Sequence, residues 1–357
     1  MRFVPANCLK PGQMLGINLT VDRNRVLLRR GVPLTMSLIL KIQRLGFQGV
    51  YIDDDLSKDL MVVNVINDEL KHKAKKELRS LFVTVESDNH RKVSTQIDVL
   101  QDVVENIVDE ILRNRSMMVN VIDIRAYDEY TFSHSINVAV LSVLLGTVLG
   151  LRRSQLNDLA MGALVHDIGK VFIDKRIINK ASKLTEEEYE KVMLHSQAGF
   201  NYIASNQHIS DDAKHVVLSH HEKFDGHGYP GGMKAEEIPL YSRIVCAADV
   251  YDALVSDRPY RQALLPSDAI EYVMSGYNTM FDPQVVDAFI KKVAPYPVGT
   301  CVKLSTGDSA IVVENFETAC LRPRVRLIAN GENTNEYVDL AHDFNALNVT
   351  IDGIVNF

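Results

Sequence analysis

The sequence predicts a mainly α-helical protein, with a helical bundle core, a small α/β N-terminal module and a small C-terminal β-barrel. Three observations predict this class of fold. Residues 120–293 follow a helical pattern with repeated helix-start signals. The hydrophobic period changes to two after the Pro-Tyr-Pro stretch at 295–297, which is typical of strands. The length of 357 residues is enough for two or three domains.

Residues 1–55 are expected to form the N-terminal module. Thr35 is a suitable N-cap for a helix over 36–45, and Gly46 suits the position just after its end. Three short apolar runs in this module are expected to be strands, over residues 14–18, 26–28 and 50–52.

Residues 56–119 are expected to be a helical connector. Its apolar residues recur at alternating spacings of four and three, which is the pattern of a heptad seam. The seam is short for a coiled coil, so two interpretations stay open: the helix packs on its own chain, or it joins two copies in a homodimer. The seam consists of Val93, Ile97, Leu100, Val104, Ile107 and Ile111.

Residues 120–293 are expected to form the helical bundle. Ser154 can cap one helix, Thr185 and Glu188 form a capping box at the start of another, and Ser210 can cap a third. Further helices are expected over 243–256, 267–274 and 283–292.

Residues 294–357 are expected to form the C-terminal module. They contain short runs with strand character, separated by turns such as Thr306-Gly307-Asp308. A small β-barrel fits five strands of this length. The runs cover residues 301–304, 310–313, 325–328, 337–340 and 348–351.

Composition and charge exclude several classes of protein. The 39 Lys and Arg against 46 Asp and Glu give a net charge of −7, which disfavours a nucleic-acid-binding protein. The four cysteines form no C-x-x-C pair, which argues against a cysteine zinc site and favours a cytoplasmic protein with reduced thiols. No secretory signal is visible. Residues 130–151 carry no Lys, Arg, Asp or Glu, but their several polar side chains favour a buried core helix over a membrane span.

Histidines are concentrated in the bundle, where eight of the eleven fall between residues 134 and 227. Two pairs, His166-Asp167 and His220-His221, follow apolar helices, and Asp249 lies inside an apolar helix. A lone histidine is more often a core residue than a ligand, but a buried carboxylate is costly unless it is paired or bound to metal. The set of five His and two Asp therefore predicts a site for two metal ions that share one carboxylate.

Two of these stretches resemble known signatures. His166-Asp167-Ile168-Gly169-Lys170 resembles the signature of HD-domain phosphohydrolases. Residues 220–230 read HHEKFDGHGYP and resemble the HHExxDGxGYP signature of the HD-GYP family of cyclic-di-GMP phosphodiesterases. The resemblance extends over 120–293, so it implies an HD-type helical bundle. Further matches lie at residues 180–185, 248–254 and 257–261.

The resemblance implies a dinuclear centre of divalent transition metal ions (Fe, Mn, Ni, Co or Zn), which His and Asp ligands suit. Some members with a third metal carry a Glu where this chain has Tyr130. A phenol is a poorer ligand at neutral pH, so we expect two metals. Asp167 would bridge them, with His134, His166 and Asp249 on one ion and His195, His220 and His221 on the other.

The resemblance also implies residues that contact or support the substrate. Lys170 resembles the family's active-site lysine beside the scissile phosphate. Asp252 and Asp225 are expected to hydrogen-bond to the metal ligands or to Lys170 without binding metal themselves. Asp252 in particular is expected to orient a metal ligand or Lys170. The implied substrate-contacting residues are Gly228, Tyr229 and Pro230 of a groove-lining loop, with Arg258 and Arg261 on phosphate or guanine.

The implied activity is phosphodiester hydrolysis. Two metals can bridge a water molecule, lower its pKa and supply a hydroxide that attacks phosphorus in line. Asp167 and Lys170 would be the catalytic groups, and cyclic-di-GMP would give pGpG; a second round that gives GMP stays open. Three alternatives stay open: a phosphodiesterase for cyclic GMP-AMP, a catalytically weak cyclic-di-GMP-binding regulator, and a protein-interaction module that uses the terminal domains.

Overall fold

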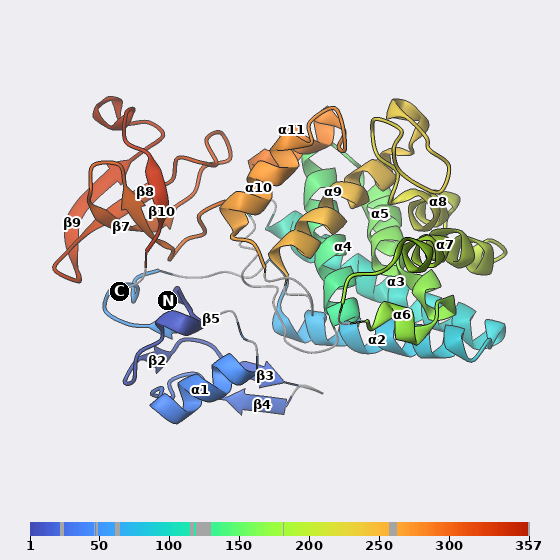
Figure 1. Ribbon diagram of the computed structural model, residues 1–357, viewed down its shortest axis with the longest axis horizontal. Helices are drawn as coiled ribbons and strands as arrows, with labels where there is room; N and C mark the ends of the chain where they lie inside the picture. The colour runs from blue at the N-terminus through green and yellow to red at the C-terminus, as the bar shows by residue number, and fades with distance from the viewer. Residues whose placement is uncertain are drawn as a thin grey trace. The chain divides into compact units, whose positions relative to one another are not determined.

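The structure is a computed structural model that divides into two compact units (Figure 1). The sheet unit comprises Met1–Asn64, Met118–Tyr130 and Val293–Phe357, and the helical unit comprises Val65–Met117 and Thr131–Lys292. The expected domain boundaries at residues 55, 119 and 293 remain a prediction, because a division into compact units does not show which parts of the chain fold independently. The structure describes residues 1–21, 25–45, 47, 49–60, 65–114, 118, 130–180, 182–256 and 263–355.

The N-terminal part of the sheet unit holds the mixed elements that the sequence predicts. An antiparallel sheet has the order β1-β5-β2, and a separate hairpin pairs β3 with β4. The Thr35 hydroxyl accepts the Leu38 N–H at 3.3 Å, so Thr35 is the N-cap of the helix as expected. The elements are β1 (Arg2–Pro5), η1 (Ala6–Cys8), β2 (Met14–Leu15), β3 (Leu19–Val21), β4 (Arg25–Leu28), α1 (Met36–Arg44) and β5 (Gly49–Asp53).

The C-terminal part of the sheet unit is an open antiparallel sheet with the order β10-β6-β7-β8-β9. The predicted barrel is therefore wrong, since the edge strands β9 and β10 do not pair. One face of the sheet packs on residues of its own module, while the other buries Ile311 and Ile328 against Leu56 and Leu60. Because residues 56–60 cover that second face, its apolar side chains are buried without closure of the sheet into a barrel. The strands are β6 (Cys301–Leu304), β7 (Ser309–Glu314), β8 (Arg324–Ala329), β9 (Glu332–Asp339) and β10 (Ile351–Ile354).

The helical unit begins with the hairpin of α2 (Asp68–Glu86) and α3 (His90–Arg113), which pack against each other (Figure 1). The capping box of Thr185 and Glu188 is confirmed, and so is the Ser210 cap. The expected Ser154 cap is wrong, because the N-cap there is Arg152. The further elements are α4 (Tyr130–Val148), α5 (Arg153–Val165), η4 (Ile168–Phe172), α6 (Lys175–Ile178), α7 (Glu186–Ile203), α8 (Asp211–Ser219), η5 (Ala235–Glu237), α9 (Leu240–Val255), α10 (Pro266–Ser275) and α11 (Pro283–Lys292). The short helix η6 (Phe344–Ala346) belongs to the sheet unit.

The heptad seam of α3 is buried inside its own chain. All six seam residues are at most 3% exposed, and α3 packs on α2 and α5. This burial agrees with the interpretation in which the connector packs on its own chain. The homodimer stays a prediction that these packing contacts do not support.

The apolar helix α4 lies in the core of the helical unit. Among the described residues it is the one helix long and apolar enough to cross a membrane, and 72% of its window Thr131–Val148 is buried inside the protein. Such burial is typical of the core helix of a bundle, which is what the polar residues within it predict.

Candidate metal centre

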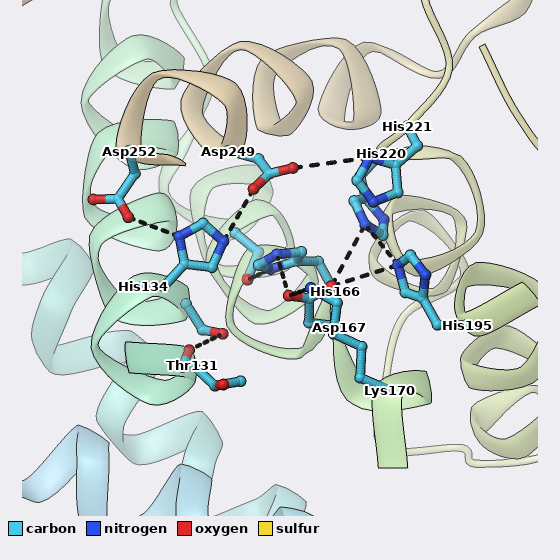
Figure 2. Close-up of polar contacts among 12 residues, drawn as sticks. Thr131, His134, His166, Asp167, Lys170, His195, His220, His221, Asp249 and Asp252 are labelled. Carbon is cyan, nitrogen blue, oxygen red and sulfur yellow. Dashed lines mark hydrogen bonds and ion pairs between the residues drawn. The ribbon is translucent and has the colours of Figure 1, made fainter. Parts of the chain in front are cut away.

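The five histidines and two aspartates of the predicted site come together in the helical unit (Figure 2). His134 lies on α4, His195 on α7 and Asp249 on α9. The two adjacent pairs lie where helices end, at the C-cap of α5 for His166-Asp167 and at the C-cap of α8 for His220-His221. Each pair can therefore turn both side chains into the same space.

Two glycines let the ligand-bearing elements approach closely. A Cβ atom on Gly169 of η4 would lie 1.9 Å from the His195 carbonyl oxygen and 2.6 Å from the Gly199 nitrogen. A Cβ atom on Gly162 of α5 would lie 2.9 Å from the Val216 side chain on α8. The backbone contact of η4 with α7 brings Asp167 beside His195, and a larger residue would force these elements apart.

Asp167 belongs to both of two neighbouring groups of candidate ligands. Its Oδ1 is 3.4 Å from His195 Nε2 and 3.9 Å from His220 Nε2, while its Oδ2 is 3.4 Å from His166 Nε2. The ligand atoms within each group lie within 4.8 Å of one another. The first group is Asp167, His195, His220 and His221, and the second is His134, His166 and Asp167.

The imidazole rings present acceptor nitrogens to this space. The Nδ1 atoms of His166, His195 and His220 donate to main-chain carbonyls at 2.7, 2.6 and 3.1 Å, which makes each Nε2 an acceptor. Among the described residues, His166 Nε2 is buried without a hydrogen-bond donor. His195 Nε2 and His220 Nε2 face each other at 3.4 Å. Buried acceptors that face one another fit a bound cation, and an N/O donor set suits divalent transition metals.

His134 is held by carboxylates on both sides. Its Nδ1 donates to Asp252 Oδ2 at 2.7 Å, and its Nε2 lies 3.0 Å from Asp249 Oδ1. Asn137, one turn further along α4, donates to Asp252 Oδ1 at 2.9 Å. Burial lowers the pKa of His134, but the hydrogen bonds to Asp249 and Asp252 outweigh it and raise this pKa to about 9. Asp252 thus fixes the orientation of the His134 ring on its Nδ1 side, while Asp249 faces the cluster.

Burial and neighbouring charges favour the metal-binding forms of the other ligands. Burial lowers the pKa of His195 and His220, and it lowers the pKa of His221 to about 3. Burial alone would raise the pKa of Asp167, but Lys170 and His166 hold it well below its usual range. The pKa of Asp249 is likewise low, because the hydrogen bond from His134 outweighs burial. Neutral imidazoles beside ionised carboxylates are the forms that bind cations.

Lys170 and Tyr229 lie against the cluster. Lys170 Nζ is 2.6 Å from Asp167 Oδ2 and its side chain is 33% exposed. The Tyr229 and His221 rings lie against each other, with their centroids 4.7 Å apart and their planes tilted by 31°, and the Tyr229 N–H donates to the His221 carbonyl at 3.2 Å. Through these two contacts the loop that carries Tyr229 and Pro230 lies against His221, one of the candidate ligands.

The remaining predicted site residues either contact residues outside the cluster or lie outside the part of the chain that the structure describes. Asp225 accepts the His227 N–H at 2.9 Å, and its own backbone N–H donates to the carbonyl of Thr279, which follows α10. These contacts join its loop to the segment after α10 and not to the candidate ligands. Arg258 and Arg261 lie outside the described residues, and so does the side chain of Tyr130.

Two supporting residues had no predicted role. Asn137 could have been found from its position three residues after His134, which places both on one face of α4. Glu222 belongs to the quoted signature, but the sequence does not show what its side chain contacts.

The comparisons with known proteins agree with this arrangement. A family model described as HD domain matches residues 99–285. A cyclic di-GMP phosphodiesterase of Pseudomonas aeruginosa is 35% identical over 264 residues, which are 73% of this chain and 64% of the relative. A 3'3'-cGAMP-specific phosphodiesterase of Vibrio cholerae is 35% identical over 166 residues, 46% of this chain and 36% of the relative. The matches thus span less than two thirds of either relative.

A solved structure shares the fold. The HDG"Y"P protein Bd1817 of Bdellovibrio bacteriovorus superposes with a TM-score of 0.53 at 17% identity, covering 80% of this chain and 97% of that one. The chain belongs to the HD domain family, and it is an HD-GYP-type member of that family.

Proposed function

We propose that this chain is a metal-dependent phosphodiesterase that hydrolyses cyclic-di-GMP to pGpG. The observation that carries the proposal is the buried carboxylate of Asp167 between two groups of imidazoles, with Lys170 Nζ 2.6 Å from its Oδ2. The relative from Pseudomonas aeruginosa, named for this substrate, supports it.

Two divalent ions would be held by the seven converging side chains, with Asp167 shared between them. His134, His166 and Asp249 would complete one site. His195, His220 and His221 would complete the other. When bound, the ions would activate a water molecule and neutralise charge on the phosphodiester.

The chain's own residues would position the substrate around this centre. Lys170 is anchored by Asp167 and partly exposed, so its ammonium can stabilise negative charge on a phosphoryl oxygen during attack. Tyr229 packs its ring against His221 and, with Gly228 and Pro230, would form the wall of the groove. Arg258 and Arg261 stay predicted contacts of phosphate or guanine.

The second candidate is a phosphodiesterase for cyclic GMP-AMP. The relative from Vibrio cholerae is as similar in identity as the one named for cyclic di-GMP, although over a shorter stretch. The cluster would serve either substrate, because both carry the same phosphodiester. A catalytically weak regulator is less favoured, since the predicted ligands and Lys170 converge.

The test is an assay of anaerobically purified full-length protein, with its metal content measured by elemental analysis. We expect about two metals per chain, and pGpG as the first product from cyclic-di-GMP, with slower turnover of cyclic GMP-AMP. Asp167→Ala should lose both metal and turnover, whereas Asp98→Ala on the exposed face of α3 should keep both. Near-normal turnover by Asp167→Ala without metal would refute the proposal.

The remaining predictions are part of the proposal. A location in the cytoplasm, a homodimer through the connector, and four domains (1–55, 56–119, 120–293 and 294–357) would be tested by fractionation, light scattering and limited proteolysis. A monomer at high concentration would remove the dimer.

A further inference from the structure

Glu222 is a buried carboxylate whose two oxygens each accept a hydrogen bond from one loop. It follows His221 directly and is 2% exposed. Its Oε1 accepts the Gly231 N–H at 2.6 Å, and its Oε2 accepts the Met233 N–H at 3.1 Å. Each carboxylate oxygen thus holds one backbone amide of the loop that carries Tyr229.

The first half of the same loop rests on the backbone beside Glu222. A Cβ atom on Gly228 would lie 2.3 Å from the Lys223 nitrogen and 2.4 Å from Glu222 Cα, so only glycine permits this contact. The next residue, Tyr229, donates its N–H to the His221 carbonyl. Tyr229 is therefore held on one side by main-chain contacts and on the other by the two amides bound to Glu222.

We propose that Glu222 is a positioning residue that fixes Tyr229 over His221 by binding the backbone of residues 231 and 233. The inference rests on the proposed function, in which Tyr229 lines the substrate groove. A loop held in its binding conformation loses less entropy when substrate binds. Glu222 therefore contributes to substrate affinity more than to the chemical step.

The test is the substitution Glu222→Gln in the metal-loaded, full-length protein. Glutamine has the same shape but one acceptor oxygen, so one of the two backbone N–H groups faces an NH2 group instead. We expect KM to rise about tenfold, as for the loss of a hydrogen bond to a charged group, with kcat changed less than about threefold. An unchanged KM overturns the proposal.

A matched control is Glu237→Gln. Glu237 is exposed, and its carboxylate accepts the Lys234 N–H at 3.0 Å at the end of the same loop. This variant should keep the wild-type KM. An equal rise in KM for both variants would show a general effect of charge on the loop and would overturn the role of Glu222.

A double-mutant cycle separates positioning from general support of the structure. If Glu222 acts through Tyr229, Glu222→Gln should raise KM less than about twofold when Tyr229→Ala is already present. Additive effects would overturn the proposal. Loss of metal with a normal KM in the loaded fraction would also overturn it, because Glu222 would then support the ligands. If Glu222→Gln does not fold, Glu222→Asp, which is too short to reach both amides, should give the same rise in KM.

Hydrogen exchange tests the loop contact without any assay of activity. Peptides covering residues 226–235 should exchange faster in Glu222→Gln than in wild type and Glu237→Gln, and equal rates would overturn the proposal. If wild type hydrolyses no cyclic dinucleotide while this difference in exchange is seen, the proposed function fails and the loop contact stands.

Discussion

Substitution of Asp252 tests whether its hydrogen bond to His134 contributes to the metal affinity of the candidate centre. Its buried carboxylate accepts the Nδ1–H of His134 at 2.7 Å and an N–H of Asn137 at 2.9 Å. Because Nδ1 is kept as the donor, Nε2 of His134 is the atom that faces Asp249 and the cluster. A carboxylate in this position also makes the imidazole a more basic ligand.

The expected losses follow from these two bonds. Asp252→Asn keeps the volume and, after rotation of the Asn137 amide, both hydrogen bonds, so it removes only the charge. A charge-assisted bond exceeds a neutral one by about 1 kcal/mol, which predicts roughly fivefold weaker metal binding. Asp252→Ala removes both bonds, and we expect a loss of up to about 100-fold.

The assay is competition between the apo-protein and a chelator of known affinity for Zn²⁺ or Mn²⁺. Asp225→Asn is the matched control, because that carboxylate binds the His227 N–H in its own loop. Binding by Asp252→Ala within twofold of wild type would refute the reasoning, since Asp252 would then have no influence on the ligand.

Three further outcomes are expected. Gly169→Ala should lower turnover at least about tenfold and lower the melting temperature, because its Cβ would lie 1.9 Å from a carbonyl oxygen of α7; wild-type values for both would contradict the close contact. Arg243→Met should cost about 3–5 kcal/mol in urea unfolding, because it leaves the buried Asp282 carboxylate without its ion pair; a cost below about 1 kcal/mol would contradict this. The hydrogen bond from Arg326 lowers the pKa of Asp59, so this pair stabilises the fold above the unfolded pKa of about 4 and the benefit is lost as pH falls through the lower folded pKa. Asp59→Asn should therefore be slightly less stable than wild type at pH 7, by less than about 1 kcal/mol because the Asp59 carboxylate is half-exposed, and this difference in stability should disappear in acid; a difference that grows in acid would contradict the assignment.

The candidate ligands could be predicted because their chemistry is visible in the sequence. His166-Asp167 and His220-His221 follow apolar helices, and Asp249 interrupts an apolar run, so each demands a partner. The atoms that orient the rings could not be predicted, since the Nδ1 partners of three histidines are main-chain carbonyls that any residue type supplies.

The C-terminal sheet shows a different limit. Alternating apolar residues predict strands, and five strands are present. The pattern does not tell which edges pair, and the face that a barrel would enclose is covered here by Leu56 and Leu60, far away in the sequence. Similarly, the heptad seam of α3 predicts a buried stripe but not whether its partner is the same chain.

The burial of Leu56 and Leu60 beneath the C-terminal sheet decides how this protein can be shortened. A truncated chain that ends near residue 293 would expose both leucines to water, at about 1.5–3 kcal/mol each, and would separate Asp59 from Arg326. The first sixty residues and the last sixty must therefore be kept or deleted together when the helical unit is expressed alone.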